Sequence, residues 1–177
     1  MTYDKPIKGR FVTLRSVDLD DASFTLSVRK DPSLTAFLPK LNITIEQQKE
    51  WIAKQRDKPG DYFFVILNND NQRIGTSGIY DITDNSAETG RLTSLGNPLE
   101  SLEAQYLSFI FAFDVLNLKS TRCYVYKENT KAIHLSEFFG TVFVAPRIEN
   151  GIEVCDGVLT KEAFKAKENF VKRMIYR

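Results

Sequence analysis

The chain has 177 residues, of which 42% are hydrophobic and 27% are charged, and its formal net charge is +1. This composition is typical of an ordinary soluble globular protein. A net charge so close to zero argues against broad electrostatic binding to nucleic acid, although net charge does not reveal a local basic patch. The length suits one domain over residues 1–177 with a sizeable core.

Targeting signals and metal-binding patterns are both missing from the sequence. No apolar run approaches the roughly 18 residues that a membrane span needs, and the N-terminal segment MTYDKPIKGR has no apolar signal core. We therefore expect a cytoplasmic protein with no membrane partner, in which Cys123 and Cys155 are reduced core residues. One histidine and two cysteines cannot build a usual zinc site, so no metal is expected.

The first part of the chain combines strand and helix signals. Residues 10–15 alternate and predict a strand, and the acidic residues 18–21 then predict a helix start, where carboxylates favour the helix dipole. Residues 33–42, which include Leu38 and Pro39, have no clear period and predict a loop or a short helical turn. Residues 44–57 open with a capping-box pattern and predict a second helix.

Three strands follow one another through short turns. They are predicted over residues 62–68, 73–82 and 87–95, and the polar turns between them favour an antiparallel meander.

Residues 95–100 read as a complete helix start. Asn97 is suited to the N-cap, Pro98 to the first helical position and Glu100 to the reciprocal capping bond. Apolar residues recur at helical spacing up to Leu116, and Asn117 is predicted as a left-handed stop. A strand that enters a helix through a glycine-bearing turn is also where proteins bind phosphates.

The last third of the chain predicts a strand, a helix, a hairpin and a closing helix. The hairpin turns at Asn150-Gly151, a favoured two-residue turn. The elements are expected over residues 120–127, 129–139, 142–147, 151–159 and 160–173. The pattern is that of an α+β fold.

Four segments together resemble the GNAT superfamily of acetyl-CoA-dependent N-acetyltransferases, and the likeness covers nearly the whole chain. It is closest to the branch that holds the ribosomal-protein N-terminal acetyltransferases and many small-molecule acetyltransferases. The segments are GRFVTLRSVDLDDA, the meander over residues 62–82, the strand–turn–helix over residues 90–118, and Val125, Asn129, Ala132 and Ile133 followed by Gly140.

The resemblance implies a mixed, mostly antiparallel sheet of about seven strands, flanked by helices, with a splayed parallel pair over residues 88–95 and 121–126. Acetyl-CoA as co-substrate would lie in the gap between this pair. By resemblance, Leu92, Thr93 and Ser94 would hold its pantetheine and acetyl groups; Gly96, Asn97, Leu99, Glu100 and Ser101 its pyrophosphate; and Asn129 and Ala132 would line its thiol end.

The expected phosphate loop departs from the family's glycine-rich pattern. Only Gly96 is glycine, Pro98 removes an amide donor, and Glu100 brings a carboxylate to the helix start. An intact capping box would occupy the remaining amides, leaving Asn97, Ser101 or Lys131 as other donors.

Acetyl transfer to an amine requires a group that takes the amine proton. Glu88 on the cofactor strand is the first candidate base, and Asp81 and Glu153 are the alternatives. Ser136 shares a helical face with Ala132 and stands where many family members have a tyrosine that protonates the departing thiolate. His134 is expected to face away from Ala132 on its helix. Phe37, Trp51 and Tyr80 could line a substrate pocket, although Trp51 better fits a core residue.

The preferred function is acetylation of a small-molecule primary amine, in particular an amino sugar or sugar nucleotide. Acetylation of a protein N-terminal α-amine and a non-catalytic binding module are the alternatives. Candidate ligands for a nucleotide diphosphate are Arg29, Lys30, Lys40 and Arg147. A homodimer through the closing hairpin and helix is left open.

Overall fold

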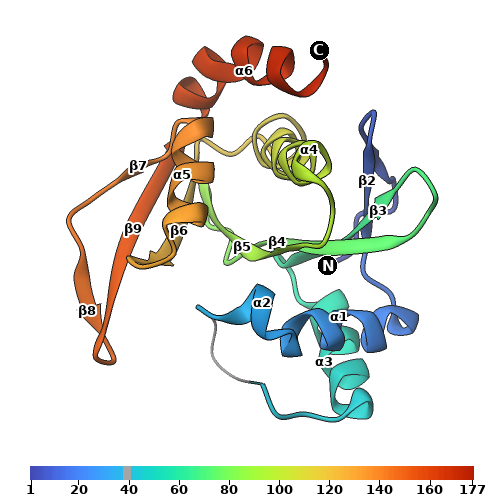
Figure 1. Ribbon diagram of the computed structural model, residues 1–177. Helices are drawn as coiled ribbons and strands as arrows, with labels where there is room; N and C mark the ends of the chain where they lie inside the picture. The colour runs from blue at the N-terminus through green and yellow to red at the C-terminus, as the bar shows by residue number, and fades with distance from the viewer. Residues whose placement is uncertain (38–40) are drawn as a thin grey trace.

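The computed structural model describes residues 1–37 and 41–177, and in this part of the chain nine strands form one sheet with helices on both faces (Figure 1). Leu38, Pro39 and Lys40 lie outside the described residues. The strands are β1 Ile7–Lys8, β2 Val12–Ser16, β3 Tyr62–Asn68, β4 Arg73–Tyr80, β5 Ser86–Ser94, β6 Ser120–Tyr126, β7 Val142–Phe143, β8 Arg147–Glu149 and β9 Ile152–Thr160.

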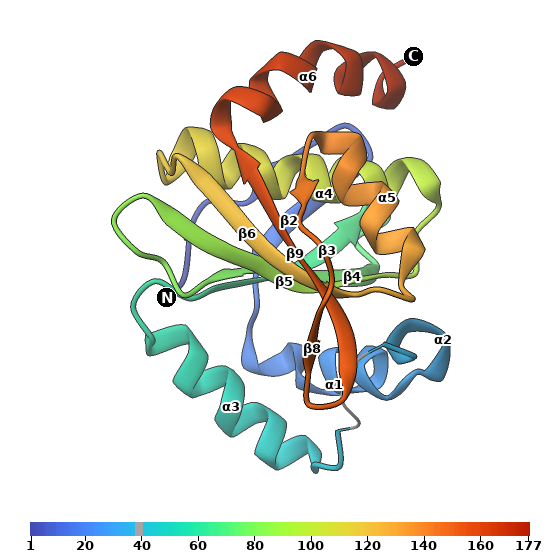
Figure 2. The same ribbon diagram turned by 90° about the vertical axis from the view of Figure 1, so that its left-hand side faces the viewer.

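The helices cluster in two groups along the chain. They are the 3-10 turn η1 Leu19–Asp21, α1 Ala22–Lys30, α2 Pro32–Thr35, α3 Ile45–Asp57, α4 Pro98–Ile110, the π-helical turn η2 Phe111–Val115, α5 Thr130–Phe139 and α6 Lys161–Ile175. Helices α1–α3 cover one face of the sheet, and α4, α5 and α6 lie on the other (Figures 1 and 2). Of the described helices, none is both long and apolar enough to span a bilayer.

The sheet order is β1-β2-β3-β4-β5-β6-β9-β7, with β8 also paired to β9. Every pairing is antiparallel except that of β5 with β6, which confirms the predicted meander and mixed sheet. The expected count of about seven strands differs from the nine described because β1 precedes the predicted first strand and the first arm of the hairpin divides into β7 and β8.

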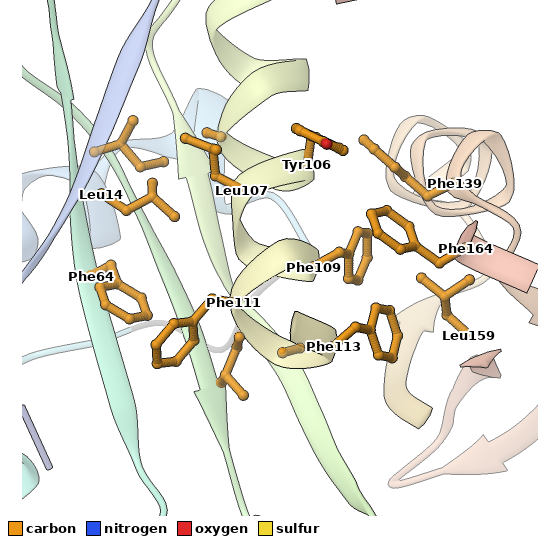
Figure 3. Close-up of a cluster of buried hydrophobic side chains, with 14 of the residues drawn as sticks. Leu14, Phe64, Tyr106, Leu107, Phe109, Phe111, Phe113, Phe139, Leu159 and Phe164 are labelled. Atoms are coloured by element: carbon orange, nitrogen blue, oxygen red, sulfur yellow. The ribbon is translucent and has the colours of Figure 1, made fainter. Parts of the chain in front are cut away.

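The larger core lies between the sheet and α4, and aromatic rings fill it (Figure 3). The Phe111 ring packs edge-on against Phe64, with 5.1 Å between ring centroids. Phe109 joins the sheet side to Phe139 of α5 and Phe164 of α6, at 5.2 and 5.7 Å. Because each buried phenylalanine contributes roughly 1.5–3 kcal/mol, this cluster fixes α4, and with it the helix start, against the sheet.

Helix starts and stops follow the local sequence signals. Thr44 caps its helix with the predicted capping box, and Asp18, at the predicted acidic helix start, forms a complete capping box as well. Asn117 has φ 54° and adopts the left-handed stop that the sequence predicted; Gly140, which ends α5, is also left-handed, with φ 106°. Strand β4 ends two residues earlier than predicted, because Asp81 turns into the left-handed region with φ 48°.

Candidate active site

A cleft opens where the parallel strands β5 and β6 separate. Their pairing covers only three residue pairs and ends at Glu88 with Arg122, while both strands continue beyond this point. The predicted splayed pair is therefore present, and a cleft of about 210 Å³ lies at its opening. The cleft is lined by residues from β4, β5, β6, α4 and α5 and by Phe37.

A bulge in β5 adjoins the point of separation. Thr76 pairs with Thr93 and Gly78 with Gly90, so one residue of β4 faces two residues of β5, Arg91 and Leu92. A Cβ at Gly75 would come 2.2 Å from the Thr93 carbonyl oxygen, so glycine is required for this close approach.

Side chains lock the bulge in place. Arg91 has φ 52°, a strained value for a residue that is not glycine. The Thr76 hydroxyl donates to the Arg91 carbonyl oxygen at 2.7 Å and lies 2.8 Å from the Thr93 hydroxyl. The Thr93 side chain is thus buried and engaged with β4, whereas Leu92 lines the cleft.

Glu88, the predicted base, lies in the cleft opposite Tyr80. The two residues are register partners, so their side chains share one face of the sheet. The Tyr80 hydroxyl donates to Glu88 Oε1 at 2.8 Å. Burial and the neighbouring Glu88 carboxylate raise the pKa of the Tyr80 hydroxyl far above its ordinary value, so the phenol is protonated at neutral pH.

The Arg91 guanidinium lies over the face of the Tyr80 ring. Its guanidinium carbon lies 4.2 Å from the Tyr80 ring centroid and 5.3 Å from that of Trp51. Two nearly parallel bonds, of 2.6 and 3.0 Å, join the guanidinium to the buried carboxylate of Asp61. No local pattern in the sequence predicts this pairing. Trp51 is 38% exposed, so its prediction as a core residue was wrong, and it does not line the cleft. Its ring makes an edge-to-face contact with Phe63 and lies below the Arg91 guanidinium.

Asn129, Ala132 and Ser136, from helix α5 and its N-cap, all line the cleft. Asn129 caps the helix, because its side-chain oxygen accepts from the Ala132 amide at 3.2 Å. Cys123 lies beside Ser136; burial raises the pKa of this thiol to about 11, and the hydrogen bond with Ser136 opposes the rise. The thiol is therefore protonated at neutral pH and is not an activated nucleophile.

The predicted phosphate-binding turn is closed by its own capping bonds. Asn97 Oδ1 accepts from the amides of Leu99 and Glu100 at 2.9 and 3.1 Å, and Glu100 Oε2 accepts from the Asn97 amide at 2.8 Å. The Gly96 amide donates to the Ser94 hydroxyl at 3.2 Å, and the Ser101 amide donates to the Asn97 carbonyl. Since proline has no amide hydrogen, every N–H between residues 96 and 101 has a partner within the chain.

The other candidate bases lie away from the cleft. Asp81 stands in the turn after β4, 3.4 Å from the Lys58 ammonium, and Glu153 is paired with Lys127 at 3.0 Å. His134 is exposed and faces away from the cleft, as expected.

Of the basic residues proposed for a nucleotide diphosphate, Arg29, Lys30 and Arg147 do not line the cleft. Arg147 binds Asp156 and Glu149, at 2.5 and 2.6 Å. The Lys30 ammonium donates to the Ile43 carbonyl oxygen at 3.0 Å, and Arg29 lies on the same helix. Lys40 is outside the described residues.

Comparison with known proteins identifies this arrangement. Residues 12–142 match the family described as the acetyltransferase (GNAT) domain. The chain belongs to this family. Its splayed parallel pair, bulged strand and following helix start are therefore parts of a GNAT domain, and the protein is an acyltransferase. Acetyl-CoA is the acetyl donor of GNAT acetyltransferases.

Three known proteins resemble the chain in sequence or in structure. The chain is 27% identical over 112 residues to acetyltransferase PseH of Campylobacter jejuni, covering 60% of this chain and 68% of that protein. It matches the structure of apo FdhC, described as a nucleotide-linked sugar GNAT, with TM-score 0.83 and 22% identity over 99% of both chains. It matches spermidine N-acetyltransferase from Vibrio cholerae, in complex with CoA and spermine, with TM-score 0.79 and 19% identity over 87% and 98% of the two chains.

The GNAT site of this chain fits acetyl-CoA in one half only. The gap between β5 and β6 leaves the β6 side of β5 without a strand partner beyond Glu88, which suits the amide-bearing pantetheine arm. At the start of α4 the capped amides do not fit a pyrophosphate in this arrangement, because no free backbone donor is presented there.

Proposed function

We propose that the protein transfers the acetyl group of acetyl-CoA to the primary amine of a small molecule, an amino sugar or sugar nucleotide. The observation that carries the proposal is the cleft between β5 and β6, with a carboxylate and a tyrosine on one side and Ser136 and Asn129 on the other. Such a cleft can admit an amine and a thioester from opposite sides and bring them together at the bulge.

The proposed step needs three groups from the chain. The amine nitrogen forms a bond to the thioester carbonyl carbon, its proton passes to Glu88, and the carbon–sulfur bond breaks with its electron pair leaving on sulfur. The sulfur takes a proton from the Ser136 hydroxyl or from a water molecule, and the proton held by Glu88 then returns through solvent to replace it. The backbone N–H of Leu92 or Thr93 stabilises the negative charge that develops on the carbonyl oxygen.

The cofactor residues predicted from the sequence stay part of this proposal. Asn129 and Ala132, with Leu92, are supported by their place in the cleft wall. The proposal retains Thr93 and Ser94 as ligands of the pantetheine arm. It retains the turn residues as ligands of the pyrophosphate, which they can bind once their capping hydrogen bonds open: Gly96, Asn97, Leu99, Glu100 and Ser101.

The cleft favours a sugar over a polyamine. Among the described residues that line it, Glu88 is the one carboxylate, whereas a polyamine with several ammonium groups calls for several. Five aromatic side chains also line the cleft: Phe37, Tyr80, Phe109, Tyr124 and Tyr126. Aromatic faces pack well against sugar rings and nucleotide bases, as they do against other flat or apolar surfaces. The name of FdhC, a nucleotide-linked sugar GNAT, supports the same choice.

Calorimetry with acetyl-CoA, followed by thiol-release assays, tests the proposal. We expect binding, and turnover that is fastest with an amino sugar or sugar nucleotide in a panel that also contains polyamines and peptides with free α-amines. Preference for peptides would favour the ribosomal-protein branch of the resemblance, and binding without any turnover would favour a binding module. Absence of binding at millimolar acetyl-CoA would overturn the enzyme assignment.

Removing the Glu100 carboxylate is expected to tighten acetyl-CoA binding. Glu100→Gln weakens the bond to the Asn97 amide and removes a negative charge from the helix start, where it repels a pyrophosphate. We expect Kd to fall about two- to fivefold, with Tm lowered by a few degrees (roughly) because the cap is weakened. Calorimetry and a thermal melt measure both effects.

Glu46→Gln is the matched control, since Glu46 lies in the first turn of α3 away from the cleft. It should leave acetyl-CoA affinity unchanged. A higher Kd for acetyl-CoA in Glu100→Gln would show that Glu100 favours cofactor binding.

A single domain over residues 1–177, a cytoplasmic location and a possible homodimer remain part of the proposal. One continuous sheet, from β1 to β7, supports the single domain. Analytical ultracentrifugation of the purified protein tests whether it forms a homodimer.

A further inference from the structure

We propose that the Tyr80 hydroxyl is a catalytic residue that contacts the acceptor amine and passes its proton to Glu88. The inference rests on the proposed acetyl transfer, in which Glu88 takes the amine proton directly. It changes Glu88 from the group that touches the substrate to the final proton acceptor.

The first support is the position of the hydroxyl against the cofactor strand. A Cβ added to Gly90 would come 2.5 Å from the Tyr80 hydroxyl oxygen, so this oxygen occupies the space where any other residue would carry its side chain. Gly90 and Leu92 line the same cleft, just where β5 leaves β6. The hydroxyl therefore lies beside the segment of β5 proposed to hold the acetyl group.

The second support is the free capacity of the hydroxyl oxygen. A tyrosine hydroxyl has one hydrogen to donate and lone pairs to accept with. Its hydrogen is directed to Glu88 Oε1 at 2.8 Å, and across residues 1–37 and 41–177 it makes no other hydrogen bond. The oxygen can therefore accept an N–H from an amine while it donates to the carboxylate.

The third support is the rigidity of the tyrosine ring. Arg91 lies 4.2 Å from the ring centroid and is itself held by the bidentate bond to buried Asp61. Arg91 adopts its strained backbone, φ 52°, at the bulge of the cofactor strand. Strain of this kind concentrates at functional sites. Arg91 is thus a positioning residue that fixes the hydroxyl relative to β5 and Glu88.

The proton transfer balances without any further reagent. As the amine nitrogen bonds to the carbonyl carbon, its proton moves to the Tyr80 oxygen and the Tyr80 proton moves to Glu88. Tyrosine ends neutral, the carboxylate ends protonated, and the electron pair of the broken carbon–sulfur bond leaves on sulfur. Because the phenol never carries a full charge, its reluctance to ionise does not hinder the transfer.

A double-mutant cycle on Tyr80→Phe and Glu88→Gln tests the relay. Both single variants should lower kcat by about 10²-fold, and the double variant should be no slower than the slower single variant, because the two groups act as one unit. In mixtures of light and heavy water, the wild-type rate should depend quadratically on the deuterium fraction, since two protons move in one step, and the Tyr80→Phe rate should not.

Tyr62→Phe is the matched control, since Tyr62 lies on the neighbouring strand β3 and does not line the cleft. Its kcat should stay within about twofold of wild type. A Tyr80→Phe variant with unchanged kcat, or a double variant whose losses multiply, would overturn the relay while leaving the acetyltransferase assignment standing. A wild-type protein that binds acetyl-CoA but turns over no amine would instead remove the proposed function, and the relay with it.

Discussion

Replacing Glu88 with glutamine is expected to lower kcat for amine acetylation by about 10²-fold or more, which is the usual contribution of a general base. Glutamine keeps the shape of the side chain, and its oxygen can still accept the Tyr80 hydrogen bond, which is 2.8 Å long in the wild-type protein. It cannot take up a proton at neutral pH. The loss should therefore appear in kcat, while Kd for acetyl-CoA stays within about twofold of wild type.

The measurement is thiol release at saturating acetyl-CoA, with calorimetry for the cofactor. Glu153→Gln is the matched control, because Glu153 is exposed, pairs with Lys127 and does not line the cleft. Glu153→Gln should keep kcat within about twofold of wild type. Unchanged turnover in Glu88→Gln would show that water alone removes the amine proton.

The features that the sequence predicted best are those that depend on near neighbours in the chain. The cap at the start of α4 uses Asn97, Leu99 and Glu100, all within four residues, and every predicted bond of the capping box is present. Here the local pattern and the family resemblance gave competing predictions for one turn. The structure shows the cap, since hydrogen bonds that close within one turn need no other part of the fold.

The features that the sequence could not predict depend on register. Tyr80 meets Glu88 because the turn between β4 and β5 passes through Asp81 in a left-handed conformation and sets which residues face each other. A one-residue slip would place the two side chains on opposite faces of the sheet. The bulge at Arg91 depends in turn on contacts with β4, and its partner Asp61 is 30 residues away in sequence.

Glu103 is the clearest case of a long-range partner, and replacing it with alanine is expected to cause the largest loss of stability. Its side chain is fully buried on α4 and accepts hydrogen bonds from the backbone amides of Arg10, Phe11 and Val12, at 2.8, 2.6 and 2.8 Å. Burial, followed by a hydrogen bond with Glu103, raises the pKa of the Tyr176 hydroxyl. One carboxylate thus joins the start of β2 and the C-terminal segment to α4.

Alanine at position 103 would leave three backbone donors without a partner inside the protein. Each orphaned donor costs about 1–3 kcal/mol, so we expect the free energy of unfolding to fall by about 4 kcal/mol or more. Urea denaturation monitored by circular dichroism measures this loss. Glu137→Ala is the control: Glu137 is exposed on α5, and its replacement should change stability by less than about 0.5 kcal/mol.

Glutamine at position 103 separates hydrogen bonding from charge. It restores one accepting oxygen but turns an NH₂ group toward backbone amides that also donate, so we expect it to recover less than half of the loss (roughly). Full recovery would show that the negative charge is dispensable and that one acceptor suffices. A loss below about 1 kcal/mol in Glu103→Ala would mean that water replaces the carboxylate at this position. The attachment of β2 to α4 would then depend on apolar packing around Leu14 and Leu107 instead.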